Sequence, residues 1–484
     1  MDLIIRNASV LTMDPRAPRA QAAAVNGGRV AAVGTDADIL ALRTGNTKVI
    51  DAAGRTVLPG FHDSHLHLLG YAMMKRRADL RGLSSLEAVL GRLREHLAAF
   101  PPAPGEWLLA WGWDQTPYPE GRMPTRHDLD RVSPDLPIRA ARKCGHVCAL
   151  NTAALKAAGI FDDPPSSDGG VVELDGEGVP TGILKENAMD LAEPPQKTPD
   201  APALRRLIAL GAADFVRAGL TSVQSDDLSA YDGDPAVLFD AYTGLDAQGG
   251  LPRSVGEQML LHDPDRLREV IAQGYVTGWG GGRFHIGPLK LLTDGSLGGR
   301  SARLRAPYAD DPSNRGVALL PGERLRELAL AAHRAGMQVA AHAIGDAAIA
   351  EVLDVFLEIQ AAHPRPDPRH RVVHASLAAP DLLERFAQGG VAADVQPAFV
   401  PADRPFLESR LGAERAAHAY RFRDFLDLGI HIAGSSDCPV EDFRPLSGIH
   451  AAVNRADGPA QRLTLHEALA LYTTGAAYNA REER

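Results

Sequence analysis

The sequence predicts an α/β protein built on a (β/α)8 TIM-like barrel, and three observations carry that prediction. From residue 201 onward, long amphipathic helical segments alternate with short, nearly continuous apolar segments. Such alternation is typical of parallel β/α units whose strands are buried on both faces. Several of the apolar segments end at a histidine, lysine or aspartate, and the chemistry of a barrel lies at the carboxyl ends of its strands. A doubly wound sheet is the alternative, but no Gly-x-Gly-x-x-Gly follows the first strand.

Residues 1–57 are predicted to form a small β domain, the amino-terminal part of a β-sandwich. Short apolar runs such as 3–5, 22–25 and 30–33 alternate there with turn signals, among them the Asn-Gly-Gly of residues 26–28. Runs of this length separated by hairpin turns favour a small antiparallel sheet.

The predicted barrel covers residues 58–470 and carries an inserted β-rich segment at about 101–195. The insertion contains two candidate strands and a Gly- and Pro-rich hairpin. Residues 471–484 are expected to begin a return to the small domain, with the remainder of that domain absent. The small sheet would then present an uncovered edge, which a second copy of the chain would cover in a homodimer.

Composition excludes several classes of partner. The 484 residues include 51 basic and 61 acidic side chains, and no basic cluster is long enough to follow a nucleic-acid backbone. No apolar run approaches the roughly 20 residues that span a bilayer, and the amino terminus lacks a secretory pattern. The three cysteines are too few for a disulfide framework. We therefore expect a cytoplasmic protein that binds neither nucleic acid nor membrane and acts on a small molecule.

The stretch around His65 and His67 is the first candidate functional site. Successive side chains of a strand point to opposite faces, so these two imidazoles would share one face while Leu66 points to the other. Two neighbouring imidazoles form half of a site for a divalent transition metal such as zinc. Because a bare His-x-His also occurs by chance, the remaining ligands must come from elsewhere in the chain.

Later strands also end at or carry residues with metal-binding chemistry, namely Lys290, His342, His374 and Asp437. Each has a structural explanation of its own, because a histidine can hydrogen-bond in a core, an aspartate can cap a turn and a lysine stem can pack against apolar neighbours. Burying all of them around one barrel axis without function would be costly, since buried polar groups need partners. The set as a whole favours a metal site.

The candidates stand in an ordered series of motifs that covers nearly the whole chain. The motifs are Leu58-Pro59-Gly60-Phe61 before His65-Leu66-His67, Trp111-Gly112-Trp113-Asp114, Gly145-His146-Val147, Lys290 before Thr293-Asp294-Gly295, Ala341-His342-Ala343, Val373-His374-Ala375 and Gly434-Ser435-Ser436-Asp437. This series resembles the amidohydrolase superfamily and, within it, the amidohydrolase-3 group of YtcJ-like metal-dependent hydrolases.

The resemblance implies a binuclear metal centre. His65, His67 and Asp437 would hold one divalent metal, and His342 and His374 would hold a second. Lys290 would bridge the two after carbamylation by CO2, because an ammonium only donates hydrogen bonds whereas a carbamate offers anionic oxygens. Two zinc ions are expected, with manganese, iron and cobalt as other metals that suit such ligands.

The resemblance also implies a hydrolase that cleaves the carbon–nitrogen bond of an amide or N-acyl compound with a metal-bound hydroxide. Asp437 would carry the proton from the attacking water to the leaving nitrogen. By position, His146 is interpreted as a hydrogen-bond donor to the substrate carbonyl or its oxyanion, with a structural role as the alternative. Trp111 and Trp113 are interpreted as pocket-lining residues, with packing in a core as the structural alternative.

Two other functions are compatible with the same residues. A mononuclear zinc deaminase of a cyclic amidine would leave Lys290 unmodified and bind a single metal. A non-catalytic barrel used for ligand sensing or regulation would turn over no substrate, but the presence of all six metal-site residue types argues against such a loss of activity.

Overall fold

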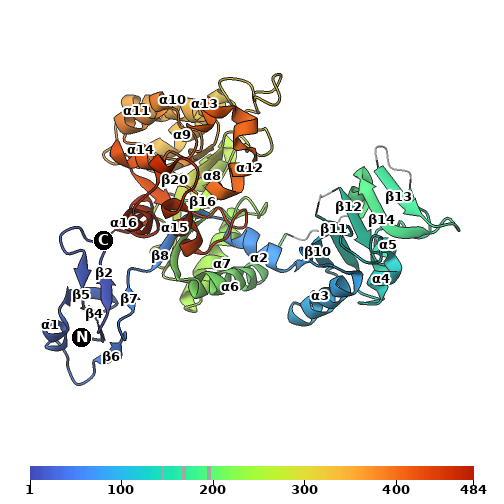
Figure 1. The fold of residues 1–484 in the computed structure, drawn as a ribbon, viewed down its shortest axis with the longest axis horizontal. Coiled ribbons are helices and arrows are strands. Elements are labelled where there is room, and N and C mark those ends of the chain that lie inside the picture. The colour runs from blue at the N-terminus through green and yellow to red at the C-terminus, as the bar shows by residue number, and fades with distance from the viewer. Residues whose placement is uncertain (144–145, 166–169, 193–197, 484) are drawn as a thin grey trace. The chain divides into compact units, whose positions relative to one another are not determined.

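The structure is a computed structural model of the chain, in which two compact units are present (Figure 1). The first unit joins Met1–Gly70 to Ala201–Arg484, and the second is Tyr71–Asp200. Within the part of the chain that the structure describes, no helix combines the length and the apolar character needed to cross a bilayer. The described residues are 1–143, 146–165, 170–192 and 198–483.

Two small sheets form the amino-terminal part of the first unit. Their elements are β1 (Leu3–Arg6), β2 (Ser9–Leu11), β3 (Arg19–Ala20), β4 (Ala22–Asn26), β5 (Arg29–Gly34), α1 (Asp36–Leu40), β6 (Lys48–Asp51) and β7 (Thr56–Val57). One sheet has the order β5-β4-β1-β6, and the other has the order β3-β2-β7. β1 pairs antiparallel with β4 but parallel with β6, because α1 carries the chain across before β6 begins. The larger sheet is therefore mixed rather than purely antiparallel.

Eight parallel strands form the nearly closed barrel that the sequence predicts. They are β8 (Phe61–Leu66), β15 (Leu220–Ser225), β16 (Ser254–Leu260), β17 (Phe284–Leu292), β18 (Val339–Ala343), β19 (Arg371–His374), β20 (Ala392–Val395) and β21 (Ile432–Gly434). Their order in the sheet follows the chain from β8 to β21. β16 is not apparent from the sequence, because Gly256, Glu257 and Gln258 interrupt its apolar pattern although all three are buried.

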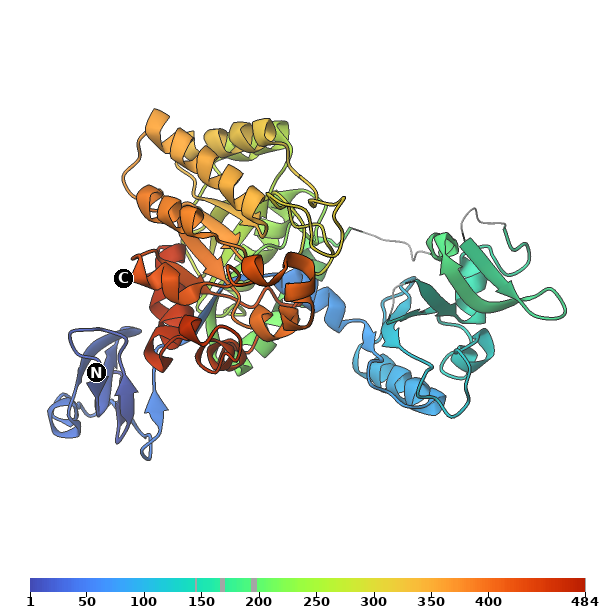
Figure 2. The ribbon, with the colours of Figure 1, turned by 45° about the horizontal axis from the view of Figure 1, so that its top comes forward.

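Amphipathic helices accompany these strands, and Figure 2 shows those of the carboxyl-terminal half in yellow, orange and red around the barrel. In α10, buried Ile349, Val352, Leu353 and Phe356 repeat at the helical period. Residues 413–427 are divided between two short helices, α13 and α14. The helices are α2 (Leu68–Lys75), α6 (Ala201–Arg217), α7 (Pro235–Ala247), α8 (Pro264–Ala272), α9 (Gly322–Arg334), α10 (Asp346–Ala362), α11 (Pro380–Gly389), α12 (Phe399–Leu411), α13 (Ala413–Ala416), α14 (Phe422–Asp427), α15 (Pro445–Val453), η2 (Pro459–Gln461) and α16 (Leu465–Ala470).

Hydrogen bonds between the end of β8 and the segment after β21 close the barrel. The backbone N–H of Asp437 donates to the carbonyl of His65 at 2.9 Å, and the N–H of His67 donates to the carbonyl of Cys438 at 2.8 Å. The hydroxyl of Ser64 also donates to the carbonyl of Gly434 at 3.1 Å. We call this line of contacts the seam of the barrel.

Residues 471–480 are helical and pack against β8 and β21. Their elements are η3 (Leu471–Gly475) and α17 (Ala476–Ala480). The side chain of Asn479 donates to Asp394 at 2.7 Å, and its carbonyl accepts a hydrogen bond from Arg371 at 2.9 Å. Instead of turning back toward the small domain, as the sequence predicts, this segment forms helices on the barrel as far as Ala480.

The second unit is a six-stranded sheet with helices, ordered β13-β14-β12-β11-β10-β9. It starts well before the insertion predicted at about 101–195. The reason is that β9 pairs with β10, and α3 buries Val89 and Leu90 in the core of this unit. The elements are β9 (Ala78–Asp79), α3 (Leu86–Ala99), β10 (Leu108–Trp113), α4 (Arg126–Asp130), β11 (Ile138–Arg142), β12 (Val147–Leu150), α5 (Thr152–Ala157), β13 (Gly170–Leu174), β14 (Pro180–Glu186) and η1 (Asn187–Ala192).

The imidazole of His370, next to β19, is buried in an uncharged form. Its Nδ1 accepts a hydrogen bond from the backbone N–H of Val339 at 3.1 Å, and its Nε2 lies 2.8 Å from Nδ1 of His333. Burial, together with the nearby charges of His333 and Arg365, lowers the pKa of His370 to about 3. The folded state therefore resists protonation of this ring.

We expect the free energy of unfolding to decrease as the pH falls below about 6.5, because only the unfolded chain then takes up a proton at His370. This contribution is complete above that pH and decreases by about 2 kcal/mol between about pH 7.5 and about pH 5. Urea denaturation at the two pH values measures it. The free energy of unfolding should depend less on pH in His370→Asn than in the control variant His466→Asn. The imidazole of His466 is exposed in the wild type. Equal pH dependence in both variants would show that His370 does not carry this effect.

Candidate metal centre

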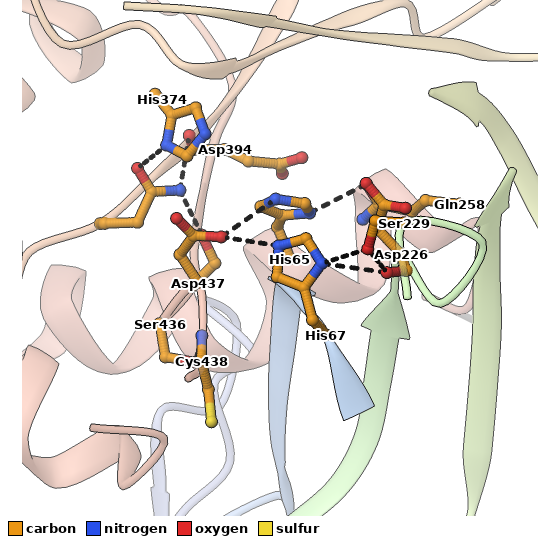
Figure 3. A network of polar contacts seen from close by, with 12 residues as sticks. His65, His67, Asp226, Ser229, Gln258, His374, Asp394, Ser436, Asp437 and Cys438 are labelled. Carbon is orange, nitrogen blue, oxygen red and sulfur yellow. Dashed lines mark hydrogen bonds and ion pairs between the residues drawn. The ribbon is translucent and has the colours of Figure 1, made fainter. Parts of the chain in front are cut away.

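Three side chains at the seam form a compact group. Each of His65, His67 and Asp437 offers one ligand atom within 4.8 Å of the other two. Oδ1 of Asp437 lies 3.1 Å from Nε2 of His67 and 3.3 Å from Nε2 of His65 (Figure 3). Strand alternation places the two imidazoles together, while Leu66 between them is fully buried. Two imidazole nitrogens and a carboxylate oxygen are ligands that zinc and related metals accept.

Neighbours on the far side of each ring fix which nitrogen carries the proton. Nδ1 of His65 lies 3.0 Å from Oε1 of Gln258. Nδ1 of His67 lies 2.9 Å from the backbone carbonyl of Asp226 and 3.0 Å from Oγ of Ser229. Because amide and backbone carbonyl oxygens only accept hydrogen bonds, Nδ1 carries the proton in both rings and Nε2 faces Asp437.

The side chains of this group shift one another's pKa values. Burial opposes charge on Asp437, but its close contacts with the imidazoles of His65 and His67 outweigh the effect of burial and hold the pKa of Asp437 well below its usual range. Burial and the charge of Lys290 lower the pKa of His65 to about 4. Burial also acts to lower the pKa of His67, but its hydrogen bond to Asp437 and the charge of Asp226 raise that pKa to about 9. A metal that binds here must therefore displace a proton from His67.

The buried carboxylate of Asp63 anchors the segment that presents Asp437. It accepts hydrogen bonds from the backbone N–H groups of Ser436 and His65, both at 3.1 Å. Burial raises the pKa of Asp63 to about 7. Asp437 itself has a positive φ of 56°, an uncommon backbone conformation for a residue other than glycine. These bonds hold that conformation in place.

Lys290, from β17, reaches the same site from within the barrel. Its side chain is almost fully buried, and its Nζ lies 3.2 Å from Nε2 of His65 and 3.4 Å from Oδ2 of Asp226. Asp226 follows β15, so its carboxylate and the lysine come from different strands. The other carboxylate oxygen of Asp226 is buried and has no hydrogen-bond partner among the described residues.

His374 and His342 extend the row of imidazoles. The ring centres of His65 and His374 are 5.7 Å apart, and those of His374 and His342 are 4.4 Å apart. Nδ1 of His374 donates to Oε1 of Gln396 at 2.9 Å, which leaves Nε2 as the free nitrogen. In His342, Nε2 lies 3.3 Å from the carbonyl of Gly295, which leaves Nδ1. The structure thus brings all six predicted metal-site side chains together at the carboxyl ends of the strands.

The other predicted site residues lie in the second unit. Nδ1 of His146 lies 3.0 Å from Oε2 of Glu186, and both side chains are exposed. The guanidinium of Arg81 lies 4.6 Å from the ring centre of half-buried Trp111. Trp113 is fully buried in the core of that unit, and its indole N–H donates to a backbone carbonyl at 2.8 Å. Its packing matches the structural alternative rather than a pocket-lining role, whereas the substrate-binding role of His146 stays a prediction.

The residues that support the ligands are not apparent from the sequence. They are chiefly Asp63, Asp226, Gln258 and Gln396. Asp226 and Gln396 directly follow the carboxyl ends of strands, which is the one sequence signal that marks them. Gln258 lies inside the unpredicted β16. Asp63 alternates with His65 along β8, but nothing in the sequence shows that its carboxylate anchors a segment more than 370 residues away.

Comparisons with known proteins agree with this geometry. Residues 48–484 match the family model described as the amidohydrolase family. The YtcJ protein of Bacillus subtilis (strain 168) is 37% identical over 445 residues, which cover 89% of this chain and 81% of YtcJ. This chain belongs to the amidohydrolase family.

Two further relatives of this amidohydrolase are informative. The N-substituted formamide deformylase of Arthrobacter pascens is 28% identical over 504 residues, which cover 99% of this chain and 89% of that enzyme. The crystal structure of an uncharacterized metal-dependent hydrolase from Pyrococcus furiosus has a TM-score of 0.81 at 30% identity, and the match covers 99% of this chain and 95% of that one. The present chain is likewise a metal-dependent hydrolase of the family that acts on carbon–nitrogen bonds.

The side chains of this amidohydrolase fit a divalent metal. The nitrogens of His65 and His67 are aimed at a buried carboxylate that stays ionised. The unpartnered oxygen of Asp226 adds a buried negative charge that a nearby cation would stabilise.

We expect the affinity of the amidohydrolase for Zn2+ to rise by about tenfold per pH unit up to about pH 9, because binding must displace one proton from His67. Chelator competition at about pH 7 and about pH 8 measures the dependence. In Asp437→Asn the pKa of His67 loses its main support, so the dependence should weaken in that variant. A zinc affinity that stays constant across this pH range would rule out the displaced proton.

Proposed function

We propose that this amidohydrolase hydrolyses the carbon–nitrogen bond of an amide or N-acyl compound. The observation that carries the proposal is the pre-oriented set of His65, His67 and Asp437 at the seam, with Lys290 in contact with His65. When bound, the metal supplies a water that ionises near neutral pH and a positive charge that polarises the substrate carbonyl.

The residues of this chain supply binding and proton transfer. His65 and His67 would hold the metal through Nε2, since Nδ1 of each ring donates to a fixed oxygen. The carboxylate of Asp437 is buried and ionised, so it accepts a proton from the attacking water and passes it to the leaving nitrogen. The burial of His65 and Asp437 limits competing reactions with bulk water.

A binuclear centre is the fuller form of the proposal. His342 and His374 lie beside His65 in the row of rings and would hold a second metal, again zinc or a related ion. Lys290, carbamylated by CO2, would bridge the two ions, because only the carbamate gives this side chain anionic oxygens. Its burial and its place next to His65 support the assignment.

The substrate is a small molecule, and the relatives suggest its class. The Arthrobacter pascens relative is named for the deformylation of N-substituted formamides. We therefore place N-formyl and short N-acyl amines first among candidate substrates, with His146 and Trp111 as candidate substrate contacts. We further propose that the protein is cytoplasmic and forms a homodimer.

One observation favours the mononuclear deaminase as the second candidate. Nζ of Lys290 lies 3.4 Å from Oδ2 of Asp226, a contact that suits an unmodified ammonium. The compact three-residue group of His65, His67 and Asp437 is sufficient for a single metal. A cyclic amidine would then replace the amide as substrate.

Hydrolysis of N-formyl and N-acyl amines by the zinc-loaded protein tests the proposed function, with Asp437→Asn as the matched variant. Asparagine keeps an oxygen ligand but takes up no proton, so we expect most of the metal to remain and turnover to fall by about 100-fold or more. A fully active Asp437→Asn enzyme would remove Asp437 from proton transfer. Deamination of cyclic amidines alone would establish the second candidate, and a loaded protein inactive on both would favour a sensing barrel.

Substitution of Lys290 tests the bridge. Lys290→Ala should lose the paired site and bind no more than one zinc ion per chain, whereas wild type prepared with bicarbonate should carry the added mass of CO2. Elemental analysis and intact-mass measurement report the two quantities. Two zinc ions in Lys290→Ala, without an added carboxylate, would show that the lysine does not bridge them.

A further inference from the structure

Two buried glutamines each face Nδ1 of a metal-site histidine. Gln258 belongs to β16, and Gln396 directly follows β20. Oε1 of Gln258 lies 3.0 Å from Nδ1 of His65 (Figure 3). Oε1 of Gln396 lies 2.9 Å from Nδ1 of His374. The exposed fractions of the two glutamines are 0% and 1%, so water does not compete for either amide.

Each amide is held at its other end. Nε2 of Gln258 donates to the backbone carbonyl of Ser64 at 2.8 Å, and Nε2 of Gln396 donates to Oγ of Ser435 at 2.7 Å. Ser64 belongs to β8 and Ser435 follows β21, so both amides are tied to the two sides of the seam. With its nitrogen engaged, each amide can only turn its oxygen toward the imidazole.

The amide oxygen determines which nitrogen of the facing imidazole carries the proton. An amide oxygen only accepts hydrogen bonds, so Nδ1 of the facing imidazole keeps its proton and Nε2 keeps its lone pair. A carboxylate in the same position would also accept this hydrogen bond, but it would add a negative charge. The site already contains the carboxylates of Asp437, Asp226 and Asp63, all buried. A neutral acceptor orients the ligand without increasing that repulsion.

We propose that Gln258 and Gln396 are positioning residues that hold His65 and His374 as metal ligands through Nε2. The inference deepens the proposed metal-dependent function and rests on it, but it concerns metal binding rather than turnover. The two glutamines act through the imidazoles and do not touch the reacting atoms.

Substitutions that remove or keep the acceptor separate this role from simple packing. Gln258→Met and Gln396→Met keep the side-chain length but lose the acceptor, and we expect the zinc affinity of each to fall by about 10- to 100-fold. Gln258→Glu and Gln396→Glu provide an acceptor again but lose the amide donor, so zinc affinity should recover in part relative to the methionine variants. Gln338→Met is the matched control, because Gln338 is 2% exposed and its amide bonds Arg369, Asn479 and Arg371 rather than a metal-site histidine.

The measurements are chelator competition with Zn2+ and the visible absorption of Co2+-loaded protein, which reports the ligand geometry. The proposal predicts weakened zinc binding and an altered Co2+ spectrum in the two methionine variants, with partial rescue in the glutamate variants and no change in Gln338→Met. Wild-type affinity in both methionine variants, or equal losses in the glutamate and methionine variants, would overturn it. Because binding is measured without substrate, failure of the wild type to hydrolyse amides would disprove the proposed substrate class and leave this comparison valid.

Discussion

Closure of the barrel is the constraint on which the rest of the structure depends. β8 and β21 lie at opposite ends of the sheet order, and the ends of the two strands meet through backbone hydrogen bonds of His65, His67, Asp437 and Cys438. Three of these four residues also form the compact metal-binding group. The ligands therefore cannot separate without opening the seam. This arrangement places a preorganised site on rigid elements rather than on free loops.

A second layer of buried polar side chains within the barrel has a different task. Arg371 and Asp394 are both completely buried and lie 2.7 Å apart. The guanidinium also donates to Gln224 at 2.6 Å and to the carbonyl of Asn479 at 2.9 Å. Removal of one member of a buried ion pair leaves an uncompensated charge, which is strongly destabilising. This layer and the helical segment 476–480 belong to the stability of the barrel, whereas the carboxyl ends of the strands hold the chemistry.

The elements that depend on local sequence pattern can be predicted from the sequence. The elements that depend on long-range contacts cannot. Seven barrel strands follow from their apolar runs, but β16 does not, because Glu257 and Gln258 are polar residues buried by contacts with other strands. The early start of the second unit depends on the pairing of β9 with β10, which joins residues about 30 positions apart. Such contacts leave little trace in a single sequence.

The candidate site shows the same division. His65, His67, Lys290, His342, His374 and Asp437 could be found because they lie at strand ends and in motifs of a known family. Gln258 and Gln396 could not, since a glutamine has no distinctive spacing and its role appears only when its amide faces an imidazole. Trp113 is the opposite case, a residue that the sequence suggests for the site but that the structure places elsewhere. An aromatic residue on a strand can line a pocket, but Trp113 packs in the core of the second unit.

The central claim is that the seam of the barrel binds a catalytic metal. X-ray diffraction from zinc-loaded crystals, collected on both sides of the zinc absorption edge, tests it most directly. The account predicts an anomalous peak in contact with Nε2 of His65, Nε2 of His67 and the carboxylate of Asp437, and the binuclear form adds a second peak beside His342 and His374. Zinc-loaded crystals with no anomalous peak at the seam would contradict the account.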